Sequence, residues 1–215
     1  MPDRPPVRAV SVPWRRLPGW MERYDARHPG TEWAFTPTVV SAGSPDGSAA
    51  QFDVPLAPLD DVSLSGLVDH LGRDWLIGIV LVRRGGFAVA RLVGASVAEA
   101  KVGRRHVQGR TKAGGWSQQR FARRRDNQAR VAFEAAGGYV QALLGPHAGA
   151  LDLLVTGGDR AAAESVLQLP ELRALRHVSR RELAGLPDPT RSVLDRAVEQ
   201  VRSVDVRVVD TAPPG

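Results

Sequence analysis

The chain of 215 residues contains no cysteine and only two lysines, Lys101 and Lys112. The lack of cysteine excludes disulfides, thiol nucleophiles, thiolate zinc sites and iron–sulfur clusters. No segment approaches the roughly 18 uninterrupted apolar residues that a membrane span needs. The proline-rich start of the chain also lacks the apolar core of a signal peptide. We therefore expect a cytoplasmic protein that does not bind membranes.

Positive charge is concentrated in one segment rather than spread along the chain. Residues 101–130 contain ten Lys or Arg and a single acid, Asp126, which gives +9 in a chain whose total is +6. The rest of the chain therefore carries −3. Arginine suits bidentate contacts with phosphate, so a local excess of arginine predicts a site for RNA.

The N-terminal part has the pattern of an extension placed before a larger domain. Residues 1–13 are rich in proline, and we expect them to be disordered. Residues 14–60 predict a helix over 14–28, a strand over 32–41, a turn over 44–48 and a returning strand over 49–54. This helix and β-hairpin extension is followed by a short helix over 61–71.

The remainder alternates between strands and helices. Two apolar runs, 75–82 and 87–93, flank Arg84-Gly85-Gly86, which predicts a β-hairpin with a first strand covered on both faces. A third strand over 97–110, strands over 151–156 and 204–209, and helices over 160–167 and 189–202 follow. The fold class is therefore α/β, a mixed sheet with flanking helices, with residues 211–215 as a disordered tail.

Residues 117–144 predict a long helix that carries the end of the basic segment. Its apolar residues recur at spacings of three and four and form one stripe: Ala129, Ala132, Phe133, Ala136, Val140, Leu143 and Leu144. The glycine pair Gly137-Gly138 costs roughly 1 kcal/mol per residue within a helix, so we expect close packing or a kink there.

The glycine pair Gly114-Gly115, followed by Gln118 and Gln119, is the most informative motif. A glutamine amide is too weak a base to deprotonate water, but it can hold a water molecule by hydrogen bonds and orient its attack on an ester. Glycine lets the backbone approach a substrate where a Cβ would collide. A simpler interpretation is a glycine loop with Ser117 as a helix cap and both glutamines without a role.

The context of this motif resembles a known family. The segment Thr111-Lys112-Ala113-Gly114-Gly115-Trp116-Ser117-Gln118-Gln119-Arg120-Phe121-Ala122-Arg123 is similar to the Gly-Gly-Gln-Ser-x-x-Arg-Phe-x-Arg segment in the central domain of eukaryotic and archaeal release factors. The order of the flanking elements over about 74–210 is similar too. The resemblance is closest to the release-factor-like hydrolases of ribosome quality control, in particular the actinobacterial VLRF group.

The resemblance implies a ribonuclease H-like release-factor catalytic domain over 61–210 that releases nascent chains from peptidyl-tRNA on stalled large ribosomal subunits. Trp116 stands where release factors have their catalytic glutamine. The quality-control relatives have a Gly-x-x-Gln pattern, which Gly115-Trp116-Ser117-Gln118 fits. The role therefore falls on Gln118, with Gln119 as the rival. The expected RNA contacts, to tRNA and ribosomal RNA, are Arg110, Lys112, Trp116, Arg120, Arg123 and Arg124.

Two other functions remain open from the sequence. Relatives without the glutamine act in recognition, so a non-catalytic ribosome- or tRNA-binding module is one alternative, and a tRNA 3′-end endonuclease is another. The acids Asp60, Asp61 and Asp74 precede the core strands, which argues against two-metal catalysis. Gly157-Gly158-Asp159 lacks the lysine of a P-loop and predicts a strand-to-helix turn. We expect no metal, no cofactor and no DNA partner.

Overall fold

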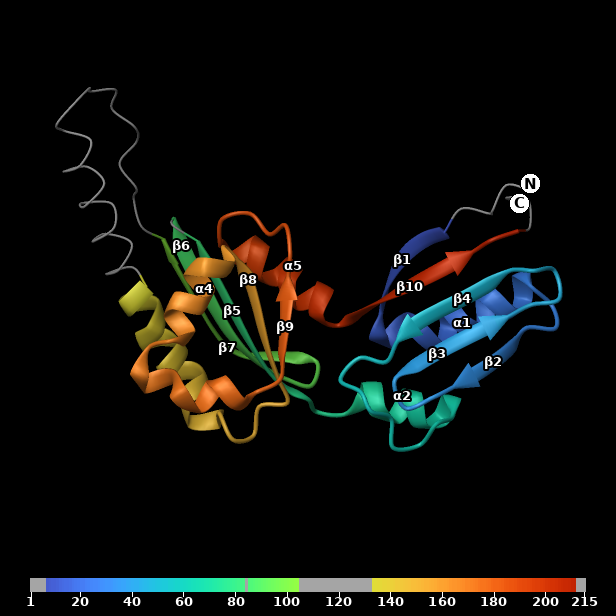
Figure 1. Cartoon of the computed structure of the whole chain (residues 1–215), viewed down its shortest axis with the longest axis horizontal. Helices are drawn as coiled ribbons and strands as arrows, with labels where there is room; N and C mark the ends of the chain where they lie inside the picture. Colours follow the sequence, from blue (N-terminus) through green and yellow to red (C-terminus); the bar gives the residue numbers. More distant parts are fainter. Residues whose placement is uncertain (1–6, 84, 105–132, 212–215) are drawn as a thin grey trace, which may run out of the picture. The chain divides into compact units, whose positions relative to one another are not determined.

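The computed structural model describes residues 7–83, 85–104 and 133–211, which form two compact units (Figure 1). The first unit comprises residues 1–73 and 199–215, and the second comprises residues 74–198. The sequence predicts an extension over 14–60 and a domain over 61–210. The observed division differs because the C-terminal strand belongs to the same unit as the N-terminal residues.

The sheet of the second unit is built from five strands in the order β7-β6-β5-β8-β9. Its strands are β5 Leu76–Arg83, β6 Gly86–Val93, β7 Ser96–Arg104, β8 Leu153–Gly158 and β9 Arg180–Leu183. β6 is antiparallel to its neighbours β5 and β7, whereas β8 and β9 run parallel to β5. This order is that of a ribonuclease H-like sheet, and the expected mixed α/β fold class is confirmed.

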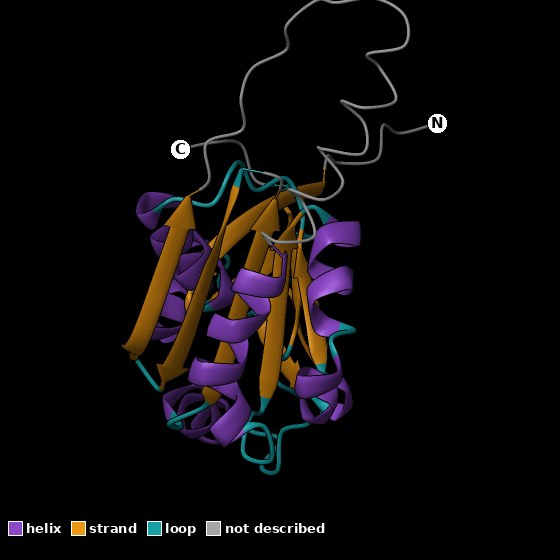
Figure 2. Cartoon of the chain, turned by 90° about the vertical axis from the view of Figure 1, so that its left-hand side faces the viewer, coloured by secondary structure: helices purple, strands orange, loops and turns teal. Residues whose placement is uncertain are grey.

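Helices cover both faces of this sheet (Figure 2). α4 (Arg160–Leu167) and the helical residues 133–144 pack on one face. α5 (Arg191–Val201) lies on the opposite face (Figure 1), and its residues from Glu199 onward belong to the first unit. Residues 77–82 of β5 are all buried, as expected for a central strand covered on both faces. Two short 3-10 helices, η2 (Gly145–His147) and η3 (Pro170–His177), complete the unit.

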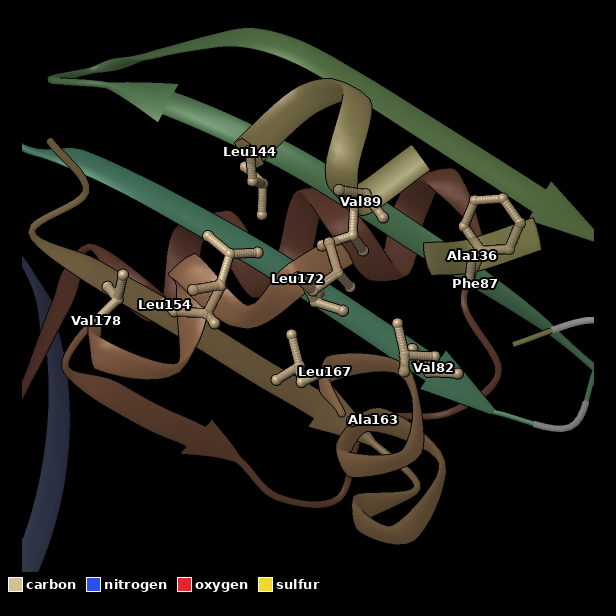
Figure 3. Packing of buried hydrophobic residues seen from close by; sticks show 14 of the residues in the cluster. Val82, Phe87, Val89, Ala136, Leu144, Leu154, Ala163, Leu167, Leu172 and Val178 are labelled. Atoms are coloured by element: carbon tan, nitrogen blue, oxygen red, sulfur yellow. The ribbon is translucent and has the colours of Figure 1, made fainter. Parts of the chain in front are cut away.

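One hydrophobic cluster joins the helices to the sheet (Figure 3). Val82, Phe87 and Val89 of β5 and β6 face Leu144 from the helical residues 133–144 and Leu167 from α4. Gly137 confirms the expected close packing, because a Cβ at that position would collide with the side chain of Leu169. Gly138 is exposed and has open space around it.

The turn between β8 and α4 forms as its residues predict. Gly158 has a φ of 93°, which favours glycine, and a Cβ there would meet the carbonyl oxygen of Val82. Asp159 caps α4, since its Oδ1 accepts a hydrogen bond from the backbone N–H of Ala162 at 3.1 Å. The motif is a structural turn in the described fold.

We expect Asp159→Ala to lower the free energy of unfolding by about 1 kcal/mol, because the N–H of Ala162 loses its acceptor. Asp159→Asn is the matched control, since asparagine caps a helix about as well as aspartate. Urea denaturation of both variants measures the difference. Equal loss in the two variants would contradict the capping role and point to the charge of Asp159 instead.

The first unit contains a second five-stranded sheet, β1-β10-β4-β3-β2, in which every neighbouring pair is antiparallel. Its strands are β1 Val7–Pro13, β2 Glu32–Phe35, β3 Val39–Gly43, β4 Ala49–Asp53 and β10 Ser203–Val209. Its helices are η1 Trp14–Arg16, α1 Leu17–Arg27 and α2 Leu64–Gly72. α1 runs along one face of the sheet (Figure 1).

Three sequence expectations need correction in this unit. Residues 7–13, expected to be disordered, form β1 because they pair along their whole length with β10. The single strand expected over 32–41 is two strands, since the chain reverses at Thr36 and Pro37, where Thr36 N–H donates to Val39 O. The last strand, expected to continue the α/β alternation, pairs with β1 and β4 instead.

Candidate functional site

Every residue of the expected catalytic and RNA-binding site lies in the segment 105–132, outside the described residues. These residues are Gly114 and Gly115, the glutamines Gln118 and Gln119, Trp116, and the basic residues Arg110, Lys112, Arg120, Arg123 and Arg124. The structure describes the two points between which this segment is held. β7 ends at Arg104, and the described residues continue at 133, which is helical.

The first attachment point lies at the edge of the sheet where the parallel strands end. Arg104 is paired with Gly86, which follows the turn from the end of β5. Val82 of β5 is in turn paired with Gly158 at the end of β8. In open α/β sheets, ligands bind beyond the carboxyl ends of the strands. The segment 105–132 therefore leaves the sheet at an edge suited to a binding site.

The second attachment point is firmly packed. Ala136, Val140 and Leu144 are buried at a spacing of four residues, and Phe133 and Leu143 pack against the same cluster (Figure 3). This is the described part of the apolar stripe that the sequence predicts. The helix face opposite to it includes Glu134, which is exposed. The C-terminal attachment of the segment is thus fixed by the core of the second unit.

An aromatic contact links this helix to β6 and β7. The rings of Phe87 and Tyr139 stack with their centroids 5.3 Å apart and an angle of 27° between their planes. Lys101 Nζ lies 5.2 Å from the centroid of Tyr139, within the range of a cation–π interaction. A Cβ at Gly103 would collide with the ring of Phe87. Tyr139 remains 39% exposed, so the contact leaves an aromatic surface beside a lysine.

Sequence patterns alone do not predict this contact. Lys101 belongs to the basic segment by composition, and Tyr139 lies off the apolar stripe of its helix. The sequence feature that points to this contact is Gly103, because a glycine within a strand often marks the close approach of a neighbouring group, here Phe87. The partner of that glycine is not readable from the sequence, because it depends on the register between β6 and β7.

A recess in this unit is lined by charged residues that pair with one another. About 240 Å³ in volume, it is lined by residues of β8, α4 and β9. Arg160 lies 3.6 Å from Glu182, and Arg180 lies 3.2 Å from Glu164. Because each carboxylate already has an arginine partner, this recess is best explained as a surface ion-pair network.

The acidic residues considered for metal catalysis are divided between the two units. Asp60 and Asp61 belong to the first unit and Asp74 to the second. The guanidinium of Arg73, 2.6 Å from Asp60, holds the pKa of that carboxyl below its usual value by donating a hydrogen bond to it. Across residues 7–83, 85–104 and 133–211, no group of three His, Asp or Glu is arranged to bind a metal ion.

Within the same described ranges, no helix combines the length and the apolar content that crossing a bilayer requires.

Comparison with proteins of known structure finds distant similarities. An archaeal translation termination factor, aRF1, is 16% identical over 84% of this chain and 61% of its own, with a TM-score of 0.36. An archaeal protein is 15% identical over 94% of this chain and 67% of its own, with a TM-score of 0.39. Archaeoglobus fulgidus Pelota is 12% identical over 93% of this chain and 64% of its own, with a TM-score of 0.31. The chain thus spans about three fifths of the length of aRF1.

No curated protein sequence matches the chain. Residues 76–207, more than half of the chain, match the family described as Actinobacteria/chloroflexi VLRF1 release factor. The matched range begins with β5, includes the whole segment 105–132 and ends within β10. Such a family indicates a ribosome-associated function in translation. On this match, the chain belongs to the Actinobacteria/chloroflexi VLRF1 release factor family.

Proposed function

We propose that the protein is a peptidyl-tRNA hydrolase that releases nascent chains from tRNA on stalled large ribosomal subunits in the cytoplasm. The observation that carries this proposal is the position of the glycine–glutamine motif. Gly114, Gly115 and Gln118 lie inside the range that matches a release-factor family. Along the chain they lie between β7 and the helical residues 133–144 of the second unit.

The proposed reaction is hydrolysis of the ester between the peptide and the tRNA ribose. The water oxygen attacks the ester carbonyl, and the bond from that carbonyl carbon to the ribose oxygen breaks. The products are a free peptide acid and a tRNA with an intact hydroxyl end. The side chain of Gln118 accepts a hydrogen bond from the water and orients it. The proton leaves to the ribose hydroxyl of the substrate or to solvent.

The arginine-rich residues around the motif serve substrate binding in this proposal. Arg110, Lys112, Arg120, Arg123 and Arg124 would contact phosphates of tRNA and ribosomal RNA, and Trp116 would stack on a base. Gly114 and Gly115 would allow the backbone to approach the tRNA end. The packed attachment at 133–144 supports this role, since a rigid support lowers the entropic cost of positioning a loop for reaction.

A non-catalytic ribosome-binding module is the second candidate function. One observation favours it: Trp116 occupies the position at which release factors have their glutamine. In that case the basic segment would bind RNA without hydrolysing the ester. The two functions predict the same binding and differ only in whether peptide is released.

A release assay tests the proposal. The full chain is mixed with stalled large-subunit complexes carrying labelled peptidyl-tRNA, and both the peptide and the tRNA 3′ end are analysed. We expect free peptide together with a full-length tRNA. Binding without release would contradict the hydrolase and support the binding module, whereas a shortened tRNA would establish an endonuclease.

A further inference from the structure

Two charged residues of the first unit, one in β1 and one directly after β10, continue strand faces that otherwise point to the core. Along β1, Val10 and Val12 turn toward α1, and Arg8 lies on the same face two residues earlier. Along β10, Val204, Val206 and Val208 are buried, and Asp210 continues the same alternation. Since side chains alternate between the faces of a strand, Arg8 and Asp210 lie on the α1 side of the sheet.

The charged residues line an open recess between α1 and the strands β1 and β10. It has a volume of about 290 Å³, and its walls include Arg8, Arg23, Arg27, Trp20, Tyr24 and Asp210 together with valines of β1 and β10. α1 and the two strands that flank the recess are visible in Figure 1. The recess therefore combines three guanidinium groups with aromatic and aliphatic surface.

The aromatic wall is held rigidly. Trp20 stacks on Tyr24 with ring centroids 5.5 Å apart, and Trp33 contacts both rings edge-on at 6.4 and 5.8 Å. His28 is buried, and its Nδ1 donates to Asp46 Oδ2 at 2.7 Å. Trp20 itself is only half-buried. Because Trp20 is also one of the residues that line the recess, it can contact a ligand bound there.

The arginines converge from different elements. Oδ2 of Asp210 lies 3.9 Å from a guanidinium nitrogen of Arg8 and 3.6 Å from one of Arg27. Both arginine side chains remain more than 60% exposed. Arg23, whose guanidinium lies beside Gly19, makes no ion pair with any residue that the structure describes. One carboxylate thus orients two arginines without neutralising the recess, whose lining has a net charge of +2.

The charge of this recess is opposite in sign to the net charge of its unit. Residues 7–73 and 199–211 contain eight arginines, no lysine and eleven Asp or Glu, a net charge of −3. The overall charge of the unit therefore repels polyanions, whereas the recess attracts them. A local reversal of sign beside exposed aromatic surface indicates a binding site rather than a general basic surface.

We propose that this recess binds a nucleotide of single-stranded RNA. Arg8, Arg23 and Arg27 supply phosphate contacts, and the indole of Trp20 supplies a stacking surface for the base. Single-stranded nucleic acids are bound by this combination of a positive groove and aromatic side chains. RNA is the expected nucleic acid because the family acts in translation. None of its residues belongs to the segment 105–132, and the proposal does not depend on ester hydrolysis.

Salt-dependent RNA binding provides the first test. The affinity of the full chain for a fluorescein-labelled ten-nucleotide RNA is measured by anisotropy between 50 and 300 mM salt. Removing one cation that neutralises an RNA phosphate makes the slope of log K against log salt less steep by about 0.7. We expect this change in Arg27→Gln, with a several-fold lower affinity.

Arg207→Gln is the matched control, since Arg207 lies on the outward face of β10 and pairs with Asp53 at 3.6 Å, the distance of the Arg27–Asp210 pair. Both variants lose one charge and one ion pair. The control should keep the wild-type slope. Equal slopes in all three proteins would overturn the proposal, because the basic segment 105–132 would then account for all RNA binding. Equal competition by a deca-glutamate peptide would also overturn it, since that peptide offers charge without bases.

Crosslinking tests the stacking contact. RNA containing 4-thiouridine is crosslinked to the full chain, and the modified tryptic peptides are identified by mass spectrometry. We expect crosslinks to the peptide 17–23, which contains Trp20, and about tenfold lower yield in Trp20→Leu. Trp20→Phe should restore most of the yield, which separates stacking from a loss of structure. Absence of crosslinks to this peptide in the wild-type protein would overturn the proposal.

Discussion

Replacing Gln118 by alanine is expected to lower the rate of peptide release by at least about 100-fold while leaving ribosome binding nearly unchanged. The physical reason is that the amide positions water at the ester, and a misplaced reactant alone costs about two orders of magnitude. Single-turnover release from stalled large-subunit complexes measures the rate, and co-sedimentation with the same complexes measures binding.

Gln119→Ala is the matched control for this prediction, because it removes the same amide one residue later. It should release peptide at close to the wild-type rate. The reverse result, with Gln119→Ala inactive and Gln118→Ala active, would transfer the role to Gln119. Parallel loss of release and binding in the Gln118 variant would instead indicate a structural role.

A double replacement, Arg123→Glu with Arg124→Glu, separates binding from catalysis. We expect this variant to bind the ribosome weakly and with a smaller dependence on salt, because fewer phosphates are neutralised and fewer counterions are released on binding. Release at saturating protein should recover toward the wild-type rate, since Gln118 is intact. The two classes of variant thus report on different steps.

Leu144→Ala is expected to have the largest effect on stability, a loss of about 3 kcal/mol in the free energy of unfolding. Leu144 is fully buried, and its side chain fills the space beside Gly78 of β5. A Cβ added at Gly78 would lie only 2.9 Å from Leu144 Cδ1. Truncation leaves a cavity there, because the glycine has no side chain with which to fill it.

Val97→Ala provides the comparison within the same unit, since Val97 is 37% exposed at the start of β7. We expect a loss below about 0.5 kcal/mol, the range of surface substitutions. Urea denaturation of both variants, followed by circular dichroism, gives the two values. Equal losses would contradict the packing role of Leu144. A decrease in release that follows the loss of folded protein would be consistent with the attachment of segment 105–132 to this helix.

Much of the second unit is readable from local patterns. The hairpin of β5 and β6, the buried central strand, the cap of α4 and the apolar stripe ending at Leu144 all follow from short-range periodicity and turn residues. η3 and β9 are not predicted by such patterns. β9 is only four residues long, and three of its residues, Arg180, Arg181 and Glu182, are charged, so it lacks the alternation of apolar and polar residues that indicates a strand. Its pairing with β8 supplies the order that its own composition does not.

For the candidate site, the sequence predicts the motif but not its surroundings. The glycine–glutamine motif and its arginines are identifiable from sequence, and their roles stay predictions because the segment 105–132 lies outside the described residues. The surroundings of the segment are not readable in this way. The stacking of Phe87 on Tyr139 brings together residues distant in the sequence. The same holds within the first unit, where Arg8 and Arg27 converge on Asp210.

The sequence by itself determined the family, the ribonuclease H-like class, the identity of most helices and strands, and the motif proposed for ester hydrolysis. These follow from local order, because periodicity, turns and motifs depend on residues close together in the chain. Only the tertiary structure decided that β1 and β10 pair across nearly the whole chain and thereby form the arginine-lined recess. Strand partnership depends on long-range burial and register, since the same alternation of valines suits any available sheet edge.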